Sequence, residues 1–311
     1  MGGVFPISYV LKYPKAIIVV LFYAVDKAEK KIRGIGANNV ILSLPFLGFG
    51  FPYSSTDELN RRREWTIEHE QKICEIYNLK DSYTSKIIAE ITRERKYKQF
   101  CFISDVIGKM FLYQPYYSDS SLNPQNDVTV VDCGAYVGDT LCDYIDAFGN
   151  RIKKIYAFEF AKSNYLKLVK EVEKQKIGGI TTCIMAGVSD KAGAVYVTDS
   201  GNPYSHASEF GEERAAMIRL DDSVKEVIGS LCIKMDVEGY EVAAIKGAAW
   251  LIKKYHPYLV VCIYHKLQDI LDVPKTIREI DNNYEFFIRG GKHLECYAIP
   301  KSHFNTMVNK I

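Results

Sequence analysis

The order of hydrophobic and polar residues changes character near residue 125. Before this point, the segments 57–79 and 81–100 are rich in charged residues and carry apolar residues at helical spacing. Each opens on an aspartate that is suited to cap a helix N-terminus. After this point, short apolar runs alternate with amphipathic stretches, which is typical of strands and helices in turn. The pattern predicts a mainly helical region over 1–125 and an α/β domain over 126–311.

The second part has the pattern of a parallel sheet that is covered by helices on both faces. Five apolar runs predict parallel strands: 128–132, 154–160, 181–188, 231–235 and 258–264. Apolar residues at helical spacing predict helices over 141–148, 163–172 and 240–255. The runs 284–289 and 295–299 are separated by a short link that contains two glycines, which predicts a hairpin. The expected fold class is α/β, with a mostly parallel seven-stranded sheet that ends in an antiparallel C-terminal hairpin.

Composition and charge narrow the classes of protein. With 48% hydrophobic and 25% charged residues, the chain has the profile of a folded globular protein. Its formal net charge of +2 gives no overall field to attract nucleic acid or anionic lipid, so we expect no nucleic-acid partner. The apolar run 17–25 is far shorter than the roughly 20 residues of a membrane span. We therefore expect neither an integral span nor a signal peptide.

Eight cysteines are scattered at long intervals, without CxxC pairs or metal-type pairing with histidine. Most of them lie within apolar runs, which is typical of buried thiols. Disulfides in a secreted protein are the alternative interpretation. Reduced thiols in a cytoplasmic protein fit the spacing better.

A glycine-bearing turn follows the first predicted strand, at the edge of the sheet where open α/β folds bind ligands. Its glycines, Gly134 and Gly138, have the spacing GxxxG. Dinucleotide folds prefer GxGxxG, with bare helix amides for a pyrophosphate. Asp132 lies inside the turn and Asp139 at the start of the next helix. Two carboxylates repel a diphosphate and suit a ligand that carries an ammonium and a sulfonium group, such as S-adenosylmethionine.

An acidic residue and an aromatic residue end the second predicted strand. Glu159 lies 25 residues beyond Gly134, at a position where a carboxylate accepts both hydroxyls of a ribose. Phe160 is placed to stack on an adenine. At the end of the third predicted strand, Gly187 and Val188 are small enough to accommodate an adenine edge. These features predict an adenosine site but do not separate NAD from S-adenosylmethionine.

The densest group of carboxylates follows the fourth predicted strand. Asp236, Glu238 and Glu241 fall within six residues, at the sheet edge where ligands bind. His265 follows the fifth predicted strand and is expected on the same rim. Two alternatives stay open. Acidic residues favour helix N-termini, so one alternative is that Glu238 or Glu241 simply begins the next helix. The other alternative is that His265 has only a structural role, as single histidines often do.

Five sequence motifs resemble those of the FkbM-type S-adenosylmethionine-dependent methyltransferases. They are VVDCGAYVGDT, YAFEF, RLDDSV, IKMDVEGYEVAAIKGA and ECYAIP, and the resemblance extends over about residues 126 to 300. It implies a Rossmann-like class I methyltransferase fold with S-adenosylmethionine as the methyl donor. The expected donor-binding residues are Asp132, Gly134, Ala135, Tyr136, Gly138, Asp139, Glu159, Phe160, Gly187, Val188 and Asp236. The expected catalytic residues are Asp236, His265 and Glu238.

The resemblance implies an O-methyltransferase that acts on a hydroxyl of a sugar, a glycan precursor or a related polyol. Because an alcohol is a weak nucleophile at neutral pH, we expect His265 or Asp236 to accept its proton. Alternatively, Asp236, Glu238 and His265 bind a divalent cation that acidifies the hydroxyl. Residues 1–125 are expected to contact the acceptor or to form a homo-oligomer. Two rival hypotheses are a catalytically inactive cofactor-binding protein and, disfavoured by the turn spacing, an NAD-dependent oxidoreductase.

Overall fold

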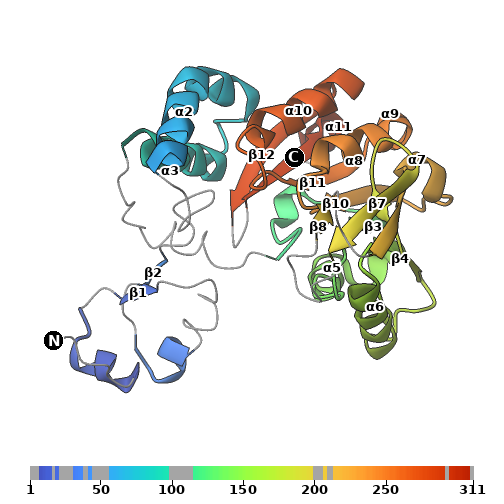
Figure 1. The fold of residues 1–311 in the computed structure, drawn as a ribbon, viewed down its shortest axis with the longest axis horizontal. Coiled ribbons are helices and arrows are strands. Elements are labelled where there is room, and N and C mark those ends of the chain that lie inside the picture. The colour runs from blue at the N-terminus through green and yellow to red at the C-terminus, as the bar shows by residue number, and fades with distance from the viewer. Residues whose placement is uncertain are drawn as a thin grey trace. The chain divides into compact units, whose positions relative to one another are not determined.

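The chain divides into two compact units (Figure 1). The N-terminal unit comprises Met1–Gln114 and Ile288–Leu294, and the C-terminal unit comprises Pro115–Phe287 and Glu295–Ile311. The structure is a computed structural model. It describes residues 7–15, 18–20, 31–37, 41–43, 56–97, 115–198, 206–208, 213–290 and 294–308.

The N-terminal unit contains a short pair of parallel strands and two long helices. Strand β1 (Ile18–Val20) pairs with β2 (Ile41–Ser43), and the 3-10 helix η1 (Ile7–Lys12) precedes them. Helices α2 (Thr56–Ile76) and α3 (Ser82–Tyr97) confirm the two predicted helices, each a few residues shorter than expected.

Asp81 caps the start of α3, as its place in the sequence predicts. Its carboxylate accepts the backbone N–H of Thr84 at 2.8 Å and forms an ion pair with Arg289 at 2.8 Å. The hydroxyl of Thr84 in turn accepts the backbone N–H of Ile288 at 3.1 Å. The cap therefore also ties residues 288–289 to this helix, within the same unit.

The C-terminal unit is built on a seven-stranded sheet with the order β12-β13-β11-β10-β3-β4-β5. Its strands are β3 (Val128–Cys133), β4 (Ile152–Phe158), β5 (Thr181–Ile184), β10 (Ser230–Met235), β11 (Tyr258–Cys262), β12 (Tyr284–Gly290) and β13 (Leu294–Pro300). Neighbouring strands from β5 to β11 are parallel, and β13 is antiparallel to β11. This confirms the predicted sheet. Because the strand order reverses between β3 and β10, the carboxyl ends of these two strands lie where open sheets bind ligands.

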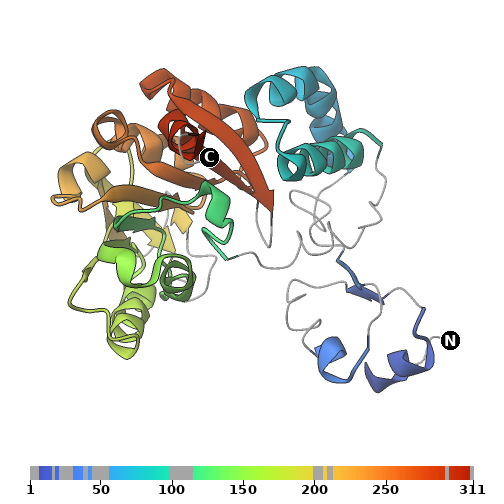
Figure 2. The same cartoon turned by 180° about the vertical axis from the view of Figure 1, so that it is seen from behind.

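Helices cover both faces of this sheet (Figures 1 and 2). On one face, α5 (Leu141–Phe148) and α6 (Lys162–Lys174) pack their apolar residues against β3 and β4. On the other face, α8 (Glu241–Gly247), α9 (Ala249–Tyr255) and α10 (Asp269–Ile280) pack against one another. The shorter elements are η2 (Ser120–Leu122), η3 (Gly149–Arg151), α7 (Leu220–Ser223) and α11 (Lys301–Val308).

Two predictions for this unit were wrong in detail. The single strand expected over 181–188 is two strands, because the N–H of Ala186 bonds back to the carbonyl of Ile184 and turns the chain away from β4. The second strand, β6, belongs to another sheet with the order β6-β9-β7-β8. The single helix expected over 240–255 is α8 and α9, which meet at Ala248, where φ is −110° and ψ is 11°. The strands of the second sheet are β6 (Gly187–Val188), β7 (Gly193–Thr198), β8 (His206–Ser208) and β9 (Glu213–Ile218).

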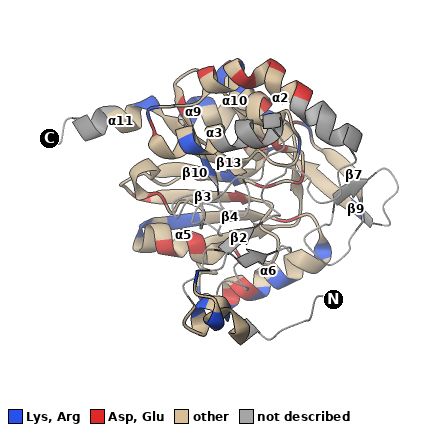
Figure 3. Cartoon of the chain, turned by 90° about the vertical axis from the view of Figure 1, so that its left-hand side faces the viewer, with Lys and Arg blue, Asp and Glu red and all other residues tan. Residues whose placement is uncertain are grey.

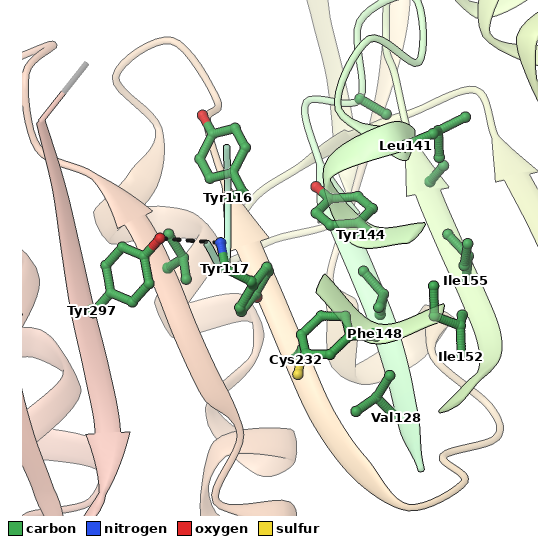
Figure 4. Close-up of a cluster of buried hydrophobic side chains, with 14 of the residues drawn as sticks. Tyr116, Tyr117, Val128, Leu141, Tyr144, Phe148, Ile152, Ile155, Cys232 and Tyr297 are labelled. Atoms are coloured by element: carbon green, nitrogen blue, oxygen red, sulfur yellow. Dashed lines mark hydrogen bonds between the residues drawn. The ribbon is translucent and has the colours of Figure 1, made fainter. Parts of the chain in front are cut away.

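The segment before β3 belongs to the core of the C-terminal unit (Figure 4). Tyr117 is buried there, and its backbone N–H donates to the hydroxyl of Tyr297 at 3.2 Å. Its ring lies with its centroid 5.1 to 6.4 Å from the rings of Tyr144, Phe148 and Tyr297. Because Tyr117 is anchored in this way, the adjacent Tyr116 is held at a fixed place in the same core.

Basic and acidic residues are interspersed along the helices α6 and α10 (Figure 3). This mixture is typical of solvated helix faces. Within the part of the chain that the structure describes, no helix is long and apolar enough to cross a bilayer.

Candidate active site

Residues 134–140, here called the β3 turn, connect β3 to α5 and are fixed by backbone contacts with two neighbouring strands. The N–H groups of Gly134 and Ala135 both donate to the carbonyl of Phe158 at the end of β4, at 3.0 and 2.9 Å. Gly134 has a φ of +81°, and a Cβ at this position would lie 1.9 Å from the carbonyl oxygen of Asp236. Glycine is therefore required because the turn lies directly against the backbone that follows β10.

A buried ion pair supports the β3 turn from below. Oδ1 of Asp132 lies 3.0 Å from Nζ of Lys234, and both side chains are at most 1% exposed. Oδ2 of Asp132 accepts the hydroxyl of Thr140 at 2.8 Å, and Lys234 also donates to the carbonyl of Gly134 at 2.7 Å. Burial by itself lowers the pKa of Lys234, but the carboxylates of Asp132 and Asp236 outweigh it and hold that pKa above its usual value. Asp132, a predicted donor-binding residue, thus lies beneath the turn and holds its shape.

Glu159 connects the end of β4 to the β3 turn. Its Oε2 accepts the backbone N–H of Tyr136 at 3.0 Å, and its Oε1 accepts that of Ala161 at 2.9 Å. Burial raises the pKa of Glu159 to about 7, although both of these N–H donors favour the ionised form. Glu159 therefore lies at the same edge of the sheet as the β3 turn, and its carboxylate is bonded to the backbone of that turn.

The remaining residues predicted to bind the donor lie at neighbouring positions. Asp139 is exposed, and Tyr136 and Phe160 are half-buried. Gly187 and Val188 are buried in β6, where a Cβ on Gly187 would lie 3.6 Å from the Cβ of Phe160. The end of β4 and the start of the second sheet therefore meet at Phe160. Gly138, with a φ of +80°, would bring a Cβ within 3.0 to 3.2 Å of side chains on α5 and α6.

Asp236 follows β10 and is held by two tyrosines. Its Oδ1 accepts the hydroxyl of Tyr264 at 3.0 Å, and its Oδ2 accepts the hydroxyl of Tyr116 at 3.3 Å. Neither tyrosine is among the residues that sequence reasoning selected. Tyr264 adjoins His265 in the chain, which is a usable signal. Tyr116 is 120 residues away from Asp236, and no sequence pattern connects the two.

His265 faces three carboxylates and forms with them the β10 rim cluster, which consists of Asp236, Glu238, Glu241 and His265. Its Nε2 lies 3.6 Å from Oδ1 of Asp236 and 3.5 Å from Oε2 of Glu238, and its Nδ1 lies 2.8 Å from Oε1 of Glu241. Burial lowers the pKa of His265, but the carboxylates of Glu238, Glu241 and Asp236 outweigh it and raise that pKa to about 10. In this arrangement the three carboxylates favour a positive charge at the imidazole.

Glu241 organises the loop between β10 and α8. It is the first residue of α8, as the alternative interpretation expected. Its Oε1 accepts the backbone N–H groups of Val237 and Gly239 at 3.1 and 3.3 Å, and the side chain of Lys266 donates to the carbonyl of Gly239. Glu238, within this loop, has a φ of +52°, which is uncommon for a residue other than glycine. The loop is therefore shaped around a fully buried carboxylate.

The fold and this edge define a class of protein, the Rossmann-like methyltransferases. The strand order, the antiparallel β13 and the acidic residues after β4 and β10 agree with this class, and one solved structure has a similar fold. The crystal structure of methyltransferase FkbM from Methylobacillus flagellatus KT has a TM-score of 0.62 at 17% identity, over 94% of this chain and 76% of that chain. An S-adenosylmethionine-dependent methyltransferase from Aquifex aeolicus is more distant, with a TM-score of 0.38, 12% identity and coverage of 64% and 94%.

The sequence assigns the chain to a family within this class. The family model of the methyltransferase FkbM domain matches residues 132–287, half of the chain, and the chain belongs to this family. Among curated proteins, no relative matches it. The matched segment contains all the predicted site residues, whereas Tyr116 lies before it.

Proposed function

We propose that this protein is an S-adenosylmethionine-dependent O-methyltransferase whose acceptor is a hydroxyl of a sugar, a glycan precursor or a related polyol. The observation that carries the proposal is the direct contact between the β3 turn and the residue after β10, where Gly134 leaves no room for a Cβ beside the carbonyl of Asp236. A donor held by this turn is next to a carboxylate that faces the rim cluster. Membership of the FkbM family supports methyl transfer as the reaction.

The residues at the β3 turn fit an adenosine-containing cation. When bound, such a donor supplies an electrophilic methyl group on its sulfonium. Each oxygen of Glu159 accepts one backbone N–H and keeps a second lone pair for a ribose hydroxyl. Asp139 is exposed at the end of the turn, where its negative charge attracts the ammonium group of the donor and repels a diphosphate.

Asp236 is the carboxylate that accepts the proton of the acceptor hydroxyl. It is partly exposed, it lies against the β3 turn, and two tyrosine hydroxyls hold its orientation. General base catalysis of this kind contributes about 100- to 10,000-fold to the rate. Holding the acceptor oxygen about 3 to 3.5 Å from the methyl carbon supplies much of the remainder.

The proposal also includes the cellular compartment of the protein and its self-association. No disulfide joins any two of the seven cysteines in the described part of the chain, which supports a cytoplasmic protein because that compartment keeps thiols reduced. The helices α2 and α3 of the N-terminal unit are the surface that we propose for acceptor contact or self-association.

Calorimetric titration of the purified protein with S-adenosylmethionine, with its demethylated product and with NAD tests the donor. We expect micromolar binding of the two sulfur nucleotides and none of NAD. Glu159→Gln should weaken donor binding at least tenfold, whereas the control Glu173→Gln, at an exposed position on α6, should not. Binding of NAD alone would overturn the proposal. Donor binding without methylation of any member of a broad glycan panel would favour the inactive cofactor-binding protein.

A further inference from the structure

Buried polar atoms without hydrogen-bond partners gather in the β10 rim cluster. Among the described residues, no hydrogen bond reaches Nε2 of His265 or Oε2 of Glu241. The side chain of His265 is only 10% exposed, and that of Glu241 is completely buried. Most buried polar atoms in folded proteins do have a hydrogen-bond partner. Two such exceptions belong to the neighbouring side chains of His265 and Glu241, next to the carboxylates of Asp236 and Glu238.

The distances around Nε2 of His265 fit the ligands of one metal ion better than they fit hydrogen bonds. The oxygens of Asp236 and Glu238 lie 3.6 and 3.5 Å from Nε2, beyond the usual range of about 2.7 to 3.2 Å for an N–H···O bond. Metal–ligand distances of about 2.0 to 2.2 Å place neighbouring ligands about 3.0 to 3.5 Å apart. The ligand atoms of Asp236, Glu241 and His265 all lie within 4.8 Å of one another, which places Glu241 in the same cluster as the two side chains at Nε2.

The other ring nitrogen has a different environment. Nδ1 lies 2.8 Å from Oε1 of Glu241, an oxygen that the N–H groups of Val237 and Gly239 already hold in place. A histidine that ligates a metal usually donates its second N–H to a carboxylate, which fixes the tautomer and the orientation of the ring. Glu241 is placed to do this, and Nε2 is then the nitrogen that faces the two remaining carboxylates.

We propose that a divalent cation binds at Nε2 of His265 between the carboxylates of Asp236 and Glu238, and that Glu241 fixes the imidazole from its other side. Carboxylate-rich sites suit Mg²⁺ and Mn²⁺. The sequence suggested these three ligands as one alternative. The role of Glu241 as the residue that positions His265 comes from the structure.

This inference deepens the proposed function and rests on it, because the open positions of the ion would take oxygens of the acceptor. Coordination to a cation makes a hydroxyl easier to deprotonate. Its proton passes to Asp236, the oxygen forms the new bond to the methyl carbon, and the methyl–sulfur bond breaks with its electron pair on sulfur. Two neighbouring hydroxyls bind one ion better than a single hydroxyl does. The acceptor class is therefore a vicinal diol, as in a sugar.

Titration of the full-length, chelator-treated protein with Mn²⁺ tests the site without depending on catalysis. We expect one bound Mn²⁺ per chain by calorimetry, with nitrogen hyperfine coupling from a single imidazole in electron spin-echo spectra. Asp236→Asn and His265→Ala should abolish this signature, and Glu241→Gln should weaken binding about 10- to 100-fold. The control Glu279→Gln, which removes an exposed carboxylate on α10, should bind as the wild type does.

Thermal unfolding of each variant shows whether it folds, and Glu238→Gln replaces any of them that does not. Failure of the wild type to bind Mn²⁺ or Mg²⁺ at millimolar concentration would overturn the inference, as would binding that His265→Ala leaves unchanged. If the chelated protein methylates its acceptor at an unchanged rate, the cation site is wrong and the proposed function stands. If Mn²⁺ binds with the expected signature but S-adenosylmethionine does not, the proposed function fails and the cation site stands.

Discussion

Two groups of charged side chains lie along β10 and just beyond its end, and they differ in the balance of positive and negative charge. Within the strand, Lys234 forms a one-to-one ion pair with Asp132 beneath the β3 turn. Beyond its end, three carboxylates face the single imidazole of His265. The first group is complete once the chain has folded, because each charge has its counter-charge. The second keeps a surplus of negative charge.

This difference in charge balance distinguishes charged residues that hold the fold from charged residues that are available to a ligand, although the two kinds look alike in the sequence. Asp132 and Asp236 both follow or end an apolar strand and both were predicted to bind the donor. Asp132 is completely buried and paired, so it shapes the turn. Asp236 is partly exposed and shares its surroundings with Glu238 and His265, so it is available to a ligand. Asp132 and Asp236 are the same type of residue. They differ in whether a counter-charge neutralises the carboxylate and in how far the carboxylate is exposed to a ligand.

The largest effect is expected from Lys234→Met. The substitution leaves Asp132 as a buried charge without a counter-charge, and breaking such a pair costs about 3 to 5 kcal/mol. The free energy of unfolding from urea titration measures this loss. The double variant Asp132→Leu with Lys234→Met removes both charges and should recover much of it. A double variant as unstable as the single one would contradict the idea that the pair is complete in itself.

A smaller loss is expected from Gly134→Ala, which tests the contact between the β3 turn and the end of β10. The backbone there has a φ of +81°, and the added Cβ would overlap the carbonyl of Asp236, so we expect at least about 1 to 3 kcal/mol of destabilisation. Gly178→Ala is the matched control, because nothing lies within 4 Å of a Cβ there, and it should change stability by less than about 0.5 kcal/mol. Equal effects of both substitutions on urea unfolding would refute the contact.

Glu159 is an intermediate case, a buried carboxylate that accepts two backbone N–H groups and forms no ion pair with any residue that the structure describes. Its pKa of about 7 in the folded protein lies above its ordinary value of 4.5. Between these pH values the folded state holds more protons than the unfolded state, so stability falls as pH rises, by up to about 1.4 kcal/mol per pH unit. Urea unfolding from pH 4.5 to 7.5 should show this slope in the wild type and a shallower slope in Glu159→Gln. Identical slopes would show that burial does not raise this pKa.

The smallest effect on stability is expected from Glu238→Gln in the β10 rim cluster. Its carboxylate is 39% exposed and belongs to the surplus of negative charge, so we expect stability to change by less than about 0.5 kcal/mol. Methyl transfer should nevertheless fall at least tenfold, because the proposed function places the carboxylates of the rim cluster beside the acceptor. Thermal unfolding and initial rates measure the two effects. If the variant lost stability but kept full activity, the carboxylate of Glu238 would have a structural role and no role in methyl transfer.

Much of the fold follows from local spacing along the chain. The apolar runs that became β3, β4, β10 and β11 were predicted within a few residues, and so were α2 and α3. The run 181–188 was misjudged because a strand and the next strand of another sheet are both apolar there, and the turn at Ala186 leaves no mark in the pattern. The sheet formed by β6 to β9 has short strands, and no periodic signal predicted it.

The sequence by itself determined the order of strands and helices in the seven-stranded sheet domain, the family, and the acidic motifs at the ends of the strands. These depend on residue spacing within short windows, which the chain order preserves. Only the tertiary structure decided which charges neutralise one another. It paired Asp132 with Lys234, brought Tyr116 to Asp236, and left three carboxylates around His265. The physical reason is that electrostatic and hydrogen-bonding energies depend on distance and burial in space, and neither can be measured along the chain.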